Sequence, residues 1–214
     1  MGEIKTLLTI AISIALVNNM VMAKFLGLCP FVGITKKISS AIGMGIAVIF
    51  VMTMTSVVTW LLYQYVLLSG PQNLVGHFSE YVRANGLVEV LRTTLYILVI
   101  AVLVQLVEMA MKKSTPALYR ALGIYLPLIT TNCCVLGVAL LNTTDARSPL
   151  SLLGATVQGF FGGVGFMLAM LLMSGIREQL ELADVPKPLQ GMPIAFLCTG
   201  LMAISFMGFS GMVE

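Results

Sequence analysis

The chain has 214 residues, of which 58% are hydrophobic and 10% are charged, and its formal net charge is +3. A mean hydropathy of +1.00 excludes an ordinary soluble domain and predicts an integral membrane protein. The small net positive charge gives no reason to expect a nucleic acid as a partner.

Six mainly apolar windows follow one another along the chain, each near the roughly 20 residues that a membrane-spanning helix requires. They cover about residues 7–25, 42–67, 94–111, 121–141, 152–174 and 192–209. The first window starts after "GEIK", has a long apolar stretch and is followed by no small-residue cleavage pattern, so we expect a spanning helix rather than a cleaved signal peptide. The sequence therefore predicts one all-α membrane domain of six transmembrane helices.

The basic residues predict the orientation of these helices. Eight of the twelve lysines and arginines lie on the side of the first, third and fifth connections, and four lie on the opposite side. Because cytoplasmic loops are enriched in lysine and arginine, we expect the first, third and fifth loops in the cytoplasm and both termini on the outer side.

A short motif occurs once in each half of the chain. "CPFVG" runs from Cys29 to Gly33 and "CCVLG" from Cys133 to Gly137, so both read Cys-x-x-x-Gly. Six helices then divide into two repeats of three, about 1–112 and 113–214. Because three is odd, the second repeat must be inverted relative to the first.

Both motifs are accompanied by residues that interrupt a helix. These are Asn18, Asn19, Gly27 and Pro30 in the first segment, and Gly123, Pro127, Thr130, Thr131 and Asn132 in the fourth. Backbone groups freed by such breaks are tolerated at membrane depth only where protein or a cavity satisfies them. We therefore predict that the first and fourth helices are broken and meet near the middle of the bilayer, with one segment folding back or tilting to bring the motifs together.

The four cysteines differ in their expected roles. Cys198 has apolar neighbours and is expected to fill space in the core. Cys29 and Cys133 occupy matching places beside helix breaks, where freed backbone N–H groups or a metal would stabilise a thiolate. A disulfide between them is an alternative, but it does not explain the broken helices, whereas a metal site does.

The number of sulfurs limits the kind of metal site. A [2Fe–2S] cluster needs four ligands, and two from this chain require a partner that supplies the others. Cys134 is a further candidate, but adjacent side chains on a helix diverge by about 100°. No self-contained Cys-x₂-Cys run is present.

Two longer segments carry a resemblance to a known family. "NNMVMAKFLGLCPFVGITKK" and "YLPLITTNCCVLGVALLN" resemble the signature segments of the A subunits of Rnf complexes, which are ion-translocating ferredoxin:NAD oxidoreductases. These are related to the E subunit of the sodium-pumping NADH:quinone reductase. The resemblance implies an electron-transfer subunit that is not catalytic alone, in a bacterial or archaeal cytoplasmic (inner) membrane.

The same resemblance implies a site and its partners. Cys29 and Cys133 would hold a [2Fe–2S] cluster shared with a homologous six-helix subunit of opposite topology, the E subunit of Rnf. The family commonly has alanine at the position of Cys134. Other Rnf subunits, including iron–sulfur and flavin-carrying ones, would exchange electrons with this cluster while Na⁺ or H⁺ moves across the membrane.

Residues around the motifs have expected roles, and two rival functions stay open. Asn132 is expected either to satisfy backbone at the break or to donate to a cluster sulfur. Leu28, Phe31, Val135 and Leu136 are expected to exclude water, and the small residues at 155, 159 and 163 to form a helix-packing face. The rival functions are a secondary transporter with an inverted repeat and no metal, and a scaffold protein, and neither would contribute iron–sulfur absorbance.

Overall fold

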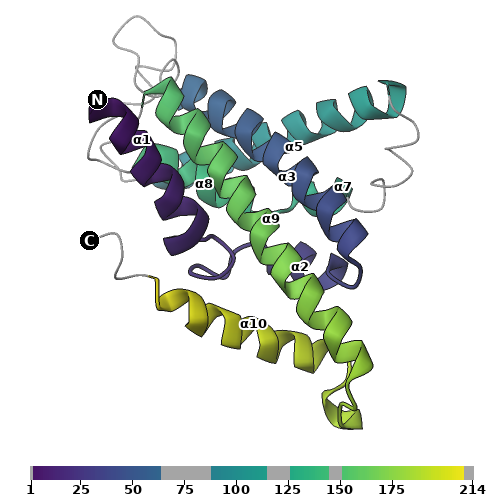
Figure 1. Ribbon diagram of the computed structural model, residues 1–214. Coiled ribbons are helices and arrows are strands. Elements are labelled where there is room, and N and C mark those ends of the chain that lie inside the picture. Colours follow the sequence, from purple (N-terminus) through teal and green to yellow (C-terminus); the bar gives the residue numbers. More distant parts are fainter. Residues whose placement is uncertain (1, 64–87, 115–125, 145–150, 210–214) are drawn as a thin grey trace, which may run out of the picture.

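The computed structural model describes residues 2–63, 88–114, 126–144 and 151–209, and every regular element within these ranges is helical (Figure 1). The ends of two expected windows, residues 64–67 and 121–125, lie outside the described residues. The helices in chain order are α1 (Gly2–Ile12), the π-helical turn η1 (Ser13–Val17), α2 (Leu28–Ile34), α3 (Ile38–Leu62), α5 (Val88–Ser114), α7 (Leu126–Thr130), α8 (Cys133–Thr144), α9 (Leu152–Leu182), the 3₁₀ turn η3 (Lys187–Leu189) and α10 (Met192–Met207).

Among the helices that the structure describes, α3 and α9 form the most extensive pair, and they lie side by side in Figure 1. Both are long and apolar enough to cross a membrane, with 25 and 31 residues. The expected small-residue face of α9 is part of this contact: a methyl group at Gly163 would lie 2.6 Å from the Cα atom of Ile49. This face therefore packs inside the chain, against α3.

Polar contacts fix the register of the same helix pair. The Ser56 hydroxyl on α3 donates to the carbonyl oxygen of Ala155 on α9 at 2.6 Å. Asn142 on α8 donates its side-chain N–H to the Ser56 hydroxyl. These buried bonds join three helices at one point, where each polar group would otherwise lack a partner in an apolar interior.

Four shorter apolar helical segments correspond to the other four windows. They are Leu7–Val17, Thr93–Met109, Leu128–Asn142 and Met192–Met207. The first is shorter than predicted, because the chain leaves the helix after Val17 and does not re-enter one until Leu28. Conversely, α9 continues past the apolar window to Leu182, since arginine, glutamate, glutamine and leucine all favour a helix.

The core lies between the two broken segments and the central pair. Phe31, Tyr96 and Phe166 are fully buried there, together with several methionines. Figure 1 shows α10 extending away from the lower end of α9, apart from α3 and α5. Residues next to both breaks, after Val17 and after Thr130, pack in this core. The core therefore fixes the position of the residues described next.

Candidate functional site

The first break is a folded connection whose polar groups have partners. The Asn19 side chain donates to the carbonyl oxygens of Ala15 at 3.1 Å and of Gly165 at 2.8 Å, and its Oδ1 accepts the N–H of Val21 at 3.0 Å. The Leu26 N–H donates to the Met20 carbonyl at 3.0 Å. Asn19 is therefore a structural residue, which ties the connection to α9.

Gly27 ends this connection in a position that requires glycine. Its φ is +78°, in the left-handed region that costs other residues conformational energy. A methyl group there would lie 2.8 Å from Phe166 Cε2, 3.0 Å from Asn132 Oδ1 and 3.1 Å from Cys134 Sγ. The backbone of the first break thus lies directly against the side chains of the second break.

The second break is short and is organised by Asn132. Its Oδ1 accepts the N–H of Cys134 at 3.1 Å, and its carbonyl accepts the N–H of Val135 at 3.1 Å. The expected backbone role of Asn132 is therefore confirmed. The amide nitrogen Nδ2 is buried and has no hydrogen-bond partner among the described residues, so it remains available to donate.

Gly27 connects the two segments that carry the motif cysteines. The Gly27 N–H donates to Cys133 Sγ at 2.9 Å, and Cys29 follows Gly27 by two residues. Both Cys29 and Cys133 are free and exposed. The 18–27 connection thus folds back and places Gly27, two residues before Cys29, against Cys133.

The other two cysteines are placed differently. Cys134 is fully buried, and its thiol donates to the Leu26 carbonyl at 3.2 Å. It therefore faces the core behind the break, as the divergence of adjacent helical side chains requires. Cys198 is half-buried on α10 and packs against the hydrophobic core.

The donor set suits half of a [2Fe–2S] site. Cluster ligands are thiolates, and hydrogen bonds to sulfur tune the cluster, so two exposed thiols with an N–H donor at one sulfur are the groups required. Within the described residues, no group of three or more histidine, cysteine, aspartate or glutamate side chains is placed to hold a metal ion. The remaining ligands would have to come from outside this chain.

The apolar residues expected around the site pack behind it. Phe31 and Val135 are buried in the core, and Leu28 and Leu136 are half-buried against it. The two thiols are thus exposed, whereas these four apolar side chains lie in or against the hydrophobic core of the protein. Such a shell keeps water from approaching the sulfurs through the protein.

Sequence reasoning missed the residue that holds the far end of α2. Arg177 on α9 donates from Nη1 to the Val32 carbonyl at 2.6 Å and to the Thr35 hydroxyl at 3.1 Å. The Thr35 hydroxyl in turn donates to the Phe31 carbonyl at 2.6 Å. In the sequence, Arg177 is only one of the basic residues at a helix end. Nothing local indicates that it caps the short helix carrying Cys29.

Comparison with known proteins gives a consistent result over nearly the whole chain. The model of a family described as "Rnf-Nqr subunit, membrane protein" matches residues 7–213. The chain is 49% identical over 207 residues to the A subunit of the ion-translocating oxidoreductase complex of Shigella flexneri serotype 5b (strain 8401), covering 97% of each chain. The proteins of the same name from Edwardsiella ictaluri and Escherichia coli K12 show the same identity and coverage.

Proposed function

We propose that this chain, which belongs to the Rnf-Nqr family of membrane subunits, is the A subunit of an ion-translocating oxidoreductase complex and carries electrons through the membrane. It would act as one part of a multi-subunit translocating oxidoreductase and catalyse nothing alone. Its cofactor would be a [2Fe–2S] cluster shared with a homologous subunit.

One observation carries this proposal. The Gly27 N–H contacts Cys133 Sγ at 2.9 Å, and Cys29 lies two residues further along the chain. Both thiols are exposed while the neighbouring Cys134 is buried. A pair of cysteines used only for packing would be buried, because a thiol behaves as a small apolar group.

Two exposed thiols on one chain call for a partner with two more. A homologous subunit of opposite topology, like the E subunit of Rnf, would present its own broken segments to the same site. When bound, the cluster exchanges one electron at a time. Cys29 and Cys133 would hold it, the Gly27 N–H would donate to the ligand sulfur of Cys133, and Phe31 and Val135 would help to exclude water.

Asn132 has a second role in this proposal. Its Oδ1 accepts the N–H of Cys134, which fixes the orientation of the amide. Nδ2 is then a buried donor without a partner among the described residues. A buried N–H group that lacks an acceptor costs about 1–3 kcal/mol. A sulfur acceptor at the break would remove this cost.

The proposed topology is six transmembrane helices in two inverted repeats, about 1–112 and 113–214. The Cys-x-x-x-Gly motif that occurs once in each half, at Cys29–Gly33 and at Cys133–Gly137, supports it. The distribution of lysine and arginine supports cytoplasmic first, third and fifth loops and outward termini in a bacterial inner membrane.

The names of the relatives join an oxidoreductase to ion translocation. For the complex that contains this chain, we propose electron flow between ferredoxin and NAD⁺, coupled to the movement of Na⁺ or H⁺. Iron–sulfur and flavin-carrying subunits of the complex would donate electrons to this chain and accept them from it.

The test is the iron content and visible absorbance of the anaerobically purified complex. Cys29→Ser and Cys133→Ser should each remove about two iron atoms per complex and abolish ferredoxin-dependent NAD⁺ reduction. Cys198→Ser, which alters a cysteine on α10, serves as the matched control and should change neither. If iron content and electron flow survive in both motif variants, the chain holds no cluster and the metal-free transporter becomes the better interpretation.

A further inference from the structure

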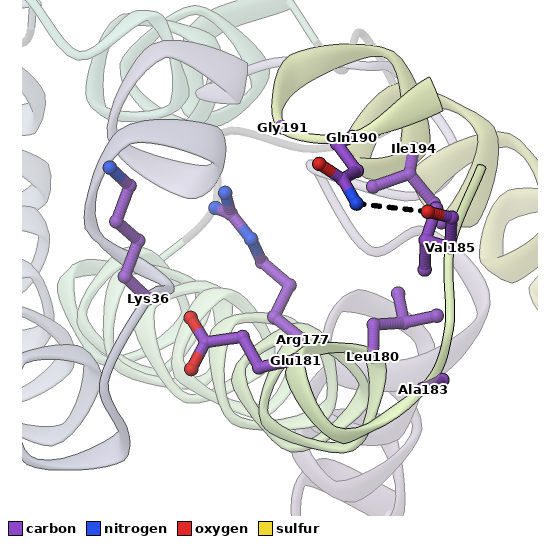
Figure 2. Close-up of a pocket in the computed structure, with 9 residues that line it drawn as sticks. All are labelled: Lys36, Arg177, Leu180, Glu181, Ala183, Val185, Gln190, Gly191 and Ile194. Carbon is purple, nitrogen blue, oxygen red and sulfur yellow. Dashed lines mark hydrogen bonds between the residues drawn. The ribbon is translucent and has the colours of Figure 1, made fainter. Parts of the chain in front are cut away.

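A pocket of about 380 Å³ with both charged and apolar walls lies at the end of α9 (Figure 2). Arg177 and Glu181 reach it from α9, Lys36 from the segment after α2, and Gln190 from the turn before α10. Its volume falls in the range of small-molecule sites, roughly 300–1,000 Å³. We refer to it as the α9–α10 pocket.

The charges of this pocket favour an anion. It contains two cationic side chains, Lys36 and Arg177, and one carboxylate, Glu181. Within the described part of the chain, neither cation has a carboxylate oxygen within ion-pair distance. Figure 2 shows the Arg177 guanidinium between the side chains of Lys36 and Gln190 in that view.

Arg177 is also held in a fixed orientation. Both of its hydrogen bonds, to the Val32 carbonyl and the Thr35 hydroxyl, leave from Nη1. Because a guanidinium carries five N–H donors, the groups on Nη2 and Nε remain for a ligand. A planar, pre-oriented guanidinium is the side chain best suited to grip two oxygens of a phosphate.

The location and walls of the pocket indicate where such a phosphate would come from. The apolar window of α9 ends at Ser174, so Arg177 lies where a membrane-spanning helix leaves the hydrocarbon region. Leu180, Val185 and Ile194 add apolar lining beside the charges. Basic pockets between membrane helices on the cytoplasmic side are typical sites for anionic lipid headgroups.

We propose that the α9–α10 pocket binds the phosphate group of an anionic phospholipid, with the Lys36 ammonium and the Nη2 and Nε groups of Arg177 as its ligands. The apolar lining contacts the glycerol region of the lipid. Because Arg177 also caps α2, a bound lipid reinforces the attachment of that helix to α9. The proposal is independent of the cluster and of electron transfer.

The experiment titrates the delipidated, detergent-purified complex with phosphatidylglycerol and counts the lipids retained on this chain by native mass spectrometry. Phosphatidylcholine, which has the same phosphate but no net charge, is the comparison lipid. Lys36→Gln is the test variant and Lys37→Gln the matched control, since both residues are exposed neighbours and only Lys36 lines the pocket. Glu181→Gln removes the negative charge of the pocket and tests whether lipid retention then rises.

We expect wild type to retain phosphatidylglycerol in preference to phosphatidylcholine. Lys36→Gln should weaken this retention about fivefold, the effect of one basic residue near an anionic headgroup, whereas Lys37→Gln should not change it. Glu181→Gln should strengthen retention. Equal losses in the two lysine variants, or equal retention of the two lipids, would overturn the proposal.

Inorganic phosphate distinguishes the two sources of the anion. If millimolar phosphate leaves lipid retention unchanged, the headgroup is the ligand, as proposed. If phosphate displaces the lipid and its own binding falls in Lys36→Gln but not in Lys37→Gln, the phosphate chemistry stands while the lipid source is overturned.

Discussion

Replacing Gly27 with alanine tests how closely the two breaks depend on each other. The new methyl group would meet Phe166 Cε2 at 2.8 Å, Asn132 Oδ1 at 3.0 Å and Cys134 Sγ at 3.1 Å. The left-handed backbone adds a cost of about 1–2 kcal/mol and overpacking adds about 1–3 kcal/mol, so we expect a loss of about 2–5 kcal/mol. A shift of the backbone at residue 27 that relieves the clash would also move its N–H away from Cys133 Sγ.

The assay combines the apparent melting temperature of the complex with the amplitude of its [2Fe–2S] signal in electron paramagnetic resonance. Both should fall in Gly27→Ala. Gly33→Ala is the matched control, because Gly33 lies in α2 with no atom within 4 Å of the added methyl group. There, alanine should stabilise the helix by about 1 kcal/mol. If the two variants behave alike, the close contact between the breaks is not a feature of the protein.

Two further predictions concern the attachment of the first break and the packing of the central helices. Asn19→Ala removes two donated hydrogen bonds and one accepted hydrogen bond and should destabilise the complex by about 2–4 kcal/mol, measured as a lower melting temperature. Asn18→Ala, at the exposed neighbouring residue, is the control and should have little effect on the melting temperature. Equal effects of the two variants would contradict the structural role of Asn19. Gly163→Ala places a methyl group 2.6 Å from backbone of α3 and should lower both stability and membrane yield, whereas Gly175→Ala, with open space around it, should be tolerated. Normal yield and stability of Gly163→Ala would show that α3 and α9 do not pack as described.

The sequence predicts the presence of the breaks better than their positions. Pro30 is expected to interrupt a helix, yet it is the third residue of α2, where its missing N–H has no helical partner in any case. Pro127 lies inside α7, and the second break falls at Thr131 and Asn132. Glycine, proline and asparagine thus mark the region, but the exact break depends on which tertiary partners satisfy the freed groups.

The sequence likewise predicts some residues of the candidate site but not the contacts that position them. Cys29 and Cys133 are suggested by the repeated motif, and local helix geometry indicates that Cys134 faces elsewhere. The role of Gly27 depends on Phe166, and the role of Arg177 depends on Val32, residues more than 130 positions away in each case. Contacts at such separations leave no periodic signal in one sequence.

The most direct test of the central claim compares the two adjacent cysteines. Electron paramagnetic resonance of the dithionite-reduced complex would be recorded for Cys133→Ala, Cys134→Ala and wild type, with spins counted per complex. The exposed thiol next to the Gly27 N–H is the proposed ligand, so Cys133→Ala should lose one [2Fe–2S] signal and Cys134→Ala should keep it. Retention of the signal in Cys133→Ala, or its loss only in Cys134→Ala, would contradict the account.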